Sequence, residues 1–180
     1  VKKMSEGEIT QLKKSKSLDI DEETYFKIIS DKTASLFSSC CKMGAISTNS
    51  KTKNIDMMSE FGLLVGKAFQ IRDDLFGYLS YDTGKPSLND FKQAKITLPL
   101  IHSLSKVNNR KQKEIITNLK NFKSIDKVIS FVKENGGIDY SEKIMSNLIE
   151  RSYNILNQFP ESKYKNSLHN LLDYTIKREL

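Results

Sequence analysis

Two adjacent carboxylates, Asp73 and Asp74, stand inside an otherwise apolar stretch of this sequence. Gln70 precedes them by three and four residues, so in a helix the amide and both acids share one stripe. Two neighbouring carboxylates repel each other unless a hard divalent ion or a basic group offsets their charge. The stripe is therefore a candidate Mg²⁺ site, although an acid pair on a helix more often only faces solvent.

The segment after the acids carries groups that could bind an anion. Gly77 and residues 80–90, which include a glycine and a proline, are expected to end the helix and form a loop. Lys85 lies on this loop, where it can approach anything that the two acids hold. Lys95 and Thr97 follow at the start of the next expected helix, close enough in sequence to frame the same cavity.

Lys32 and Thr33 place an ammonium and a hydroxyl side by side within an expected helix over residues 25–46. This pair could meet diphosphate oxygens, but a lysine on a helix is usually only solvated, so the residues alone leave its role open. Apolar side chains at three- and four-residue intervals predict the buried face of this helix. They are Ile28, Ile29, Leu36, Phe37, Cys40 and Met43.

The composition predicts an all-α protein with a single helical domain over residues 1–180. The chain has 8 Gly and only 3 Pro, and Lys, Glu, Leu and Ile are abundant, which favours helices over a sandwich or barrel. Residues 4–11 read as the end of one helix, with a polar link to residue 17. Asp19 and Glu22 then resemble a capping box. Further packing helices are expected over residues 111–119, 125–132, 138–159 and 164–178.

The charge balance and the rare residue types exclude several functional classes. A formal charge of +7 favours anionic partners, but the basic residues are spread out and lack zinc-finger spacing or an aromatic cluster, so no nucleic acid is expected. With 2 His, a histidine-based metal site or triad is not expected. No apolar run approaches the roughly 18 residues that span a bilayer. The adjacent Cys40 and Cys41 suit reduced core residues and a cytoplasmic location.

The compound pattern around the acid pair resembles a known family. Gln-x-x-Asp-Asp, Thr-Gly-Lys, Asn-Asp and Lys-x-Thr-Leu-Pro follow one another over about thirty residues, as in the second aspartate-rich region of trans-isoprenyl diphosphate synthases, the polyprenyl synthetase family. Tyr-x-x-Ile-x-x-x-Lys-Thr-x-x-Leu resembles the preceding helix of that family. The resemblance implies part of a large antiparallel helical bundle, corresponding to roughly the C-terminal half of a full-length member.

The resemblance also implies a reaction and roles for the candidate residues. An allylic diphosphate would ionise with the help of Mg²⁺, and isopentenyl diphosphate would attack to give a longer, short- to medium-chain, all-trans product. Asp73 and Asp74 would hold the metal. The substrate and catalytic contacts would come from Lys32, Thr33, Gln70 and Lys85, with Lys95 as a further substrate contact. The full-length form is expected to be a homodimer.

This sequence differs from the family pattern at two single positions and lacks one of the family's two aspartate-rich regions. Gly77 stands where the family often has a third Asp, and Ala94 stands where it often has Gly. No second Asp-Asp pair occurs in the 180 residues, so the first aspartate-rich region of the family is absent from them and this chain alone is expected to be inactive. The alternatives are a non-catalytic or regulatory subunit of a heteromeric prenyl diphosphate synthase, and a helical adaptor without a ligand.

Overall fold

The structure is a computed structural model that describes residues 2–17, 21–79, 89–121 and 124–177 of the chain. The described side chains are those of residues 2–14, 21–79, 91–121 and 124–175. Helices and no strands are found in these ranges, which confirms the all-α prediction. They are α1 (Lys2–Ser17), α2 (Glu22–Ile29), the π-helix η1 (Ser30–Ala34), α3 (Ser35–Ser47), α4 (Thr52–Leu79), α5 (Asn89–Lys92), α6 (Leu98–Ser105), α7 (Asn109–Lys120), α8 (Ile125–Glu134), α9 (Gly137–Leu156) and α10 (Lys163–Lys177).

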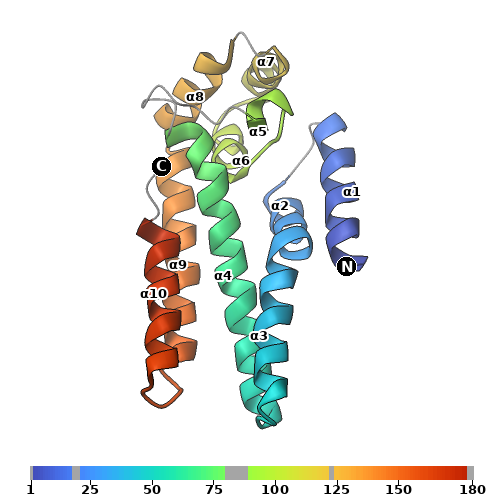
Figure 1. Ribbon diagram of the computed structural model, residues 1–180. Helices are drawn as coiled ribbons and strands as arrows, with labels where there is room; N and C mark the ends of the chain where they lie inside the picture. The colour runs from blue at the N-terminus through green and yellow to red at the C-terminus, as the bar shows by residue number, and fades with distance from the viewer. Residues whose placement is uncertain (1, 18–20, 80–88, 122–123, 178–180) are drawn as a thin grey trace.

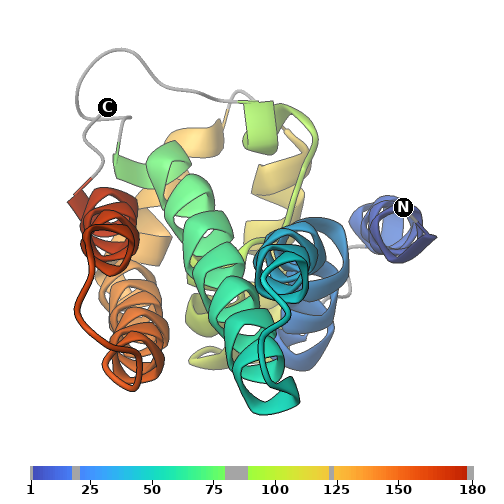
Figure 2. The same ribbon diagram turned by 60° about the horizontal axis from the view of Figure 1, so that its bottom comes forward.

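The long helix α4 lies in the centre of the molecule. Figure 1 shows α9 and α10 on one side of it and the consecutive α2, η1 and α3 on the other, with α1 outside α2. The short helices α5 to α8 gather near the end of α4 that carries the acid pair. Figure 2, in which the molecule is tilted so that its bottom comes forward, gives the same order from α10 through α9, α4 and α3 to α1. The central helix therefore contributes residues to contacts on both sides.

The core forms around α4 because apolar side chains recur along it at helical spacing. Phe61, Val65, Ala68, Ile71 and Leu75 are all at most 1 % exposed. They pack in one hydrophobic cluster with residues of α6, α8 and α9. This packing fixes the position of the neighbouring polar stripe of α4, on which Gln70 and the acids stand.

The helices α2, η1 and α3 follow one another without a gap and form one rod, which is π-helical over Ser30–Ala34. Asp21 caps the start of the rod by accepting a hydrogen bond of 2.8 Å from the backbone N–H of Thr24. The capping box expected from Asp19 lies outside the described residues. Within η1, the N–H of Ser35 bonds to the carbonyl of Ser30, five residues earlier, which is the π-helical pattern. Both candidate residues of the Lys-Thr pair lie on this turn.

Two glycines allow α4 to approach the rod closely. A Cβ atom on Gly62 would lie 2.5 Å from the carbonyl oxygen of Phe37, and one on Gly66 would lie 2.6 Å from the Cα of Ala34. Both distances are shorter than side-chain contacts allow, so glycine is required for this backbone separation. Gln70 and Asp74 continue the same four-residue spacing along α4. The close contact thus sets these two polar residues directly against the rod.

Two boundaries expected from the sequence are wrong. The polar residues up to Ser17, expected to form a link, belong to α1. Helix propensity explains this, because lysine, leucine and glutamine in this stretch all favour helix. Gly77 does not end α4, which continues to Leu79, and this glycine is buried. The expected downstream helices agree with α7 to α10 within a few residues.

The predicted buried face of α3 is only partly correct. Leu36 is 48 % exposed and Met43 is 60 % exposed, and Cys40 is exposed as well. Periodicity identified an apolar face, but nothing among the described residues covers this part of it. Cys41 is half-buried, and both cysteines are free thiols. Burial raises the pKa of the Cys41 thiol.

None of the described helices combines the length and the apolarity needed to cross a bilayer.

Candidate active site

The acid pair splits into one buried and one exposed carboxylate. Asp74 is 6 % exposed, whereas Asp73 lies on the exposed side of α4. The phenol of Tyr25 on α2 donates a hydrogen bond of 2.7 Å to Oδ2 of Asp74. The amide nitrogen of Gln70, one turn earlier on α4, donates a bond of 3.0 Å to Oδ1. These donors offset the cost of burying the charge, so Asp74 is held in place by the protein itself.

Thr33 extends this set of hydrogen bonds to the π-helix. Its hydroxyl donates to Oε1 of Gln70 at 2.7 Å, so the bonds run from Thr33 through Gln70 to Asp74. Thr33 and Gln70 are half-buried beside the close contact between η1 and α4. The structure thus brings three of the predicted site residues, Thr33, Gln70 and Asp74, into direct contact.

Lys32, the other member of the pair, faces α1 instead of α4. Its Nζ donates to Oε1 of Gln11 at 2.6 Å and lies 2.9 Å from Oε2 of Glu8. A Cβ on Gly7 would lie 2.7 Å from the backbone nitrogen of Lys32, so this glycine permits the close approach of α1. The side chains of Lys32 and Glu8 are 31 % and 49 % exposed, so the ion pair contributes only about 0–1 kcal/mol. Lys32 can therefore leave Glu8 for another anion at a small cost in free energy.

Lys95 reaches the site from the segment between α5 and α6. The preceding residue, Ala94, has a φ of 48°, a left-handed conformation that turns the chain after α5. Thr97 caps α6 without a side-chain bond to the helix, because its hydroxyl pairs with the phenol of Tyr78 at 3.1 Å. Tyr78 also packs edge-on against Phe91. These contacts fasten the Lys95 segment to α4.

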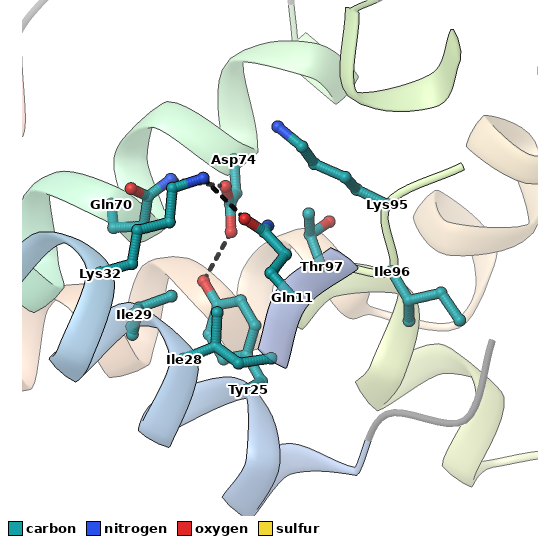
Figure 3. A pocket seen from close by; sticks show the side chains of 10 residues that line it. All are labelled: Gln11, Tyr25, Ile28, Ile29, Lys32, Gln70, Asp74, Lys95, Ile96 and Thr97. Atoms are coloured by element: carbon teal, nitrogen blue, oxygen red, sulfur yellow. Dashed lines mark hydrogen bonds between the residues drawn. The ribbon is translucent and has the colours of Figure 1, made fainter. Parts of the chain in front are cut away.

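Helix α1, the rod, helix α4 and the segment that carries Lys95 line a small cavity, shown in Figure 3. Its volume is about 30 Å³, which leaves room for ordered water. Tyr25 and Lys32 enter from the rod, Gln11 from α1 and Asp74 from α4, and Lys95 extends along the opposite rim. The remaining lining residues are Ile28, Ile29, Gln70, Ile96 and Thr97. Lys85, the other predicted phosphate contact, lies outside the described residues.

Tyr25, Gln11 and Glu8 are site residues that the sequence did not identify as such. Tyr25 lies two helical turns before Thr33, and a buried phenol requires a hydrogen-bond partner. This requirement was a usable signal, but it does not say which residue is the partner, because Asp74 is 49 positions away. Nothing in the spacing of Gln11 and Glu8 predicts their contacts with Lys32, because these contacts depend on the close approach of α1 at Gly7.

The residues present fit a divalent metal only in part. No group of three or more His, Cys, Asp or Glu able to hold a metal occurs in the part of the chain that the structure describes. Both oxygens of Asp74 accept hydrogen bonds, whereas the carboxylate of Asp73 stands on the exposed side of α4, where a metal ion can reach it. One carboxylate with substrate phosphates and water is a common way to bind Mg²⁺. The donor set therefore fits a Mg²⁺ ion held largely by a bound diphosphate.

Comparison with known proteins finds relatives that are named as prenyl diphosphate synthases. Geranylfarnesyl diphosphate synthase from Aeropyrum pernix is 30% identical over 179 residues, which cover 97% of this chain and 56% of that protein. Heptaprenyl diphosphate synthase component 2 from Bacillus subtilis is 28% identical and covers 96% of this chain and 50% of that protein. The chain thus spans about half the length of the curated relatives it matches.

A solved structure and a family model give the same result. The crystal structure of geranylgeranyl pyrophosphate synthase from Bacteroides thetaiotaomicron superposes with a TM-score of 0.88 at 31% identity, over 97% of this chain and 60% of that one. A family model described as polyprenyl synthetase matches residues 1–134, well over half of the 180 residues. The chain therefore belongs to the polyprenyl synthetase family.

Proposed function

We propose that this chain forms the diphosphate-binding part of a trans-prenyl diphosphate synthase, which condenses an allylic diphosphate with isopentenyl diphosphate. The observation that carries the proposal is the convergence of two lysines, Lys32 and Lys95, on the cavity beside Asp74. These lysines come from separate segments, and together they provide positive charge where a diphosphate would lie. The relatives named as prenyl diphosphate synthases support the same substrate class.

Each residue has a distinct part in the proposed reaction. Asp73 would hold Mg²⁺, which neutralises the charge that develops on the departing diphosphate. Lys32 would leave Glu8 and Gln11 to contact phosphate oxygens, and Lys95 would do so from the other rim. The oxygen atoms of Thr33 and Gln70 would be neutral acceptors for the positive charge left on the allylic carbon. Lys85 is a further phosphate contact proposed from the sequence alone.

Substrate binding is the direct test, because the first aspartate-rich region is absent from these 180 residues and little turnover is expected from them. Calorimetry with geranyl diphosphate should give binding that requires Mg²⁺. Lys95→Ala and Asp73→Asn should each weaken it by about tenfold, the effect of one lost charge-assisted contact. Lys113→Ala, which removes an exposed lysine of α7, is the matched control and should bind normally. Binding that ignores Mg²⁺ and both site variants would refute the proposal.

A second candidate function is a subunit that completes or regulates another synthase chain. It is favoured by the Bacillus subtilis relative, whose name describes it as a component of heptaprenyl diphosphate synthase. A subunit without a catalytic part would not bind geranyl diphosphate with Mg²⁺, so the same titration separates the two functions. The homodimer, the cytoplasmic location and the short- to medium-chain product stay predictions from the sequence.

A further inference from the structure

We propose that Tyr25 and Asp74 are positioning residues that orient the hydroxyl of Thr33, so that its lone pairs face the positive charge of the ionising substrate. This inference rests on the proposed function, but it concerns residues for which no substrate contact is proposed. Its basis is the hydrogen-bonded series Tyr25, Asp74, Gln70 and Thr33, which joins the two ends of the α2–η1 segment through α4.

The direction of every bond in this series follows from Asp74. An ionised carboxylate only accepts hydrogen bonds, so Gln70 must turn its NH₂ group toward Asp74. The Oε1 atom of Gln70 then faces Thr33 and can only accept, which makes the Thr33 hydroxyl the donor. The hydroxyl hydrogen is therefore committed to Gln70. Toward any other group, the hydroxyl of Thr33 therefore presents the two lone pairs of Oγ1.

Tyr25 holds the carboxylate of Asp74 in one orientation. Its phenol is 4 % exposed and donates to Oδ2 at 2.7 Å, while Gln70 donates to Oδ1. Because Oδ2 is held by Tyr25, the carboxylate plane is fixed for the bond to Gln70. A loosened Asp74 lets the Gln70 amide turn over, and Thr33 then has no fixed orientation.

The orientation matters only for a positively charged ligand. A lone pair directed at a cation is favourable, whereas a hydroxyl hydrogen in the same place is repulsive. The diphosphate itself is bound by other groups, namely the two lysines and the proposed metal at Asp73. Loss of the series should therefore weaken the binding of a cationic analogue of the substrate, and not the binding of a substrate whose hydrocarbon part is uncharged. A purely structural role of Tyr25 would weaken both.

The test compares two probes by calorimetry in the presence of Mg²⁺. One is geranyl diphosphate, and the other is its ammonium analogue, in which a protonated nitrogen replaces the carbon that becomes cationic. Tyr25→Phe should weaken the binding of the ammonium analogue by about tenfold relative to that of geranyl diphosphate, as expected when one contact with a charged group is lost. Binding of geranyl diphosphate should still require Mg²⁺, and the readout is the ratio of the two affinities.

Two further variants make the outcome decisive. Thr33→Val should cause the same selective loss, and the double variant should lose no more than either single one, because both act through one oxygen. Tyr140→Phe is the matched control, since Tyr140 also donates to a carboxylate, that of Glu22, at 2.8 Å, but outside the cavity. Equal weakening of both probes, additive losses, or no selective loss in Tyr25→Phe and Thr33→Val would overturn the inference. If the wild type binds neither probe with Mg²⁺, the proposed function itself fails.

Discussion

At the scale of single residues, the acid pair shows what a motif does and does not specify. The pattern predicted that Asp73 and Asp74 share a site with Gln70, and the contacts between Gln70 and Asp74 agree. It treated the two acids as equivalent, whereas one is buried and bonded and the other is exposed. Burial of Asp74 depends on Tyr25, 49 residues away, and local spacing carries no information about such a partner.

Ala94 leads to a prediction at this scale. Its left-handed φ of 48° is unfavourable for a residue with a Cβ atom, and the sequence had suggested that alanine in place of glycine was a minor change. Ala94→Gly should stabilise the protein by about 0.5–1 kcal/mol, because the relief of strain exceeds the added entropy of the unfolded chain. Urea unfolding measures this difference. A loss of stability would mean that the turn is not strained.

At the scale of elements, the structure depends on how closely helices approach one another. The helices themselves were predictable, since apolar periodicity gave α7 to α10 within a few residues. The close contact of α4 with the rod was not, because a glycine in a helix has no apolar signal. The π-helix was also missed, since it arises from packing between distant segments and the pattern of residues 25–46 is that of an ordinary helix.

Gly66 and Gly44 form a matched pair for testing this contact. Gly66→Ala places a Cβ 2.6 Å from the backbone of Ala34 and should destabilise the protein by about 1–3 kcal/mol, the usual cost of overpacking. Gly44→Ala meets nothing within 4 Å and should stabilise helix α3 by about 0.5–1 kcal/mol through helix propensity. Urea unfolding of each variant measures these changes in the free energy of unfolding. Equal effects would show that the α4 contact can relax.

The attachment of α10 to α9 should depend on pH. Tyr153 on α9 donates to Asp173 on α10, and burial together with this bond raises the pKa of Tyr153 to about 12. The unfolded phenol loses its proton near its ordinary pKa of 10, so the folded state loses its advantage as the pH rises from 10 to 12.

The free energy of unfolding of the wild type and of Tyr153→Phe, measured with urea at several pH values, checks this. The wild type should be the more stable at pH 8, and the difference should shrink above pH 10. A difference that stays constant to pH 11.5 would contradict a raised pKa of this phenol.

At the scale of the whole molecule, the uncovered surface is as informative as the core. Periodicity assigned Leu36 and Met43 to a buried face, because it detects an apolar stripe and not whether another element lies on it. In the described part of the chain the stripe is largely exposed. The central core, by contrast, is covered on all sides, and Phe61, Val65 and Ile71 are at most 1 % exposed.

Substitutions on that surface should therefore be tolerated. Leu36→Gln and Met43→Gln should change the free energy of unfolding by no more than about 0.5 kcal/mol, as for other exposed positions. Leu64→Ala, at a residue that is 3 % exposed, should cost about 2–5 kcal/mol and serves as the buried comparison. Unfolding curves at two protein concentrations give these values and show whether association occurs. A large cost at Met43 would place it in a packed contact.

The π-helical turn decides how Tyr25 and Ala34 are oriented relative to each other. The two residues are nine apart, so an unbroken α-helix would set them about 180° from each other around the helix axis. Each residue of a π-helix turns the chain by less than an α-helical residue does, so the five residues Ser30–Ala34 remove roughly the rotation of one residue. Tyr25 and Ala34 can therefore both contact α4, one at Asp74 and the other at Gly66.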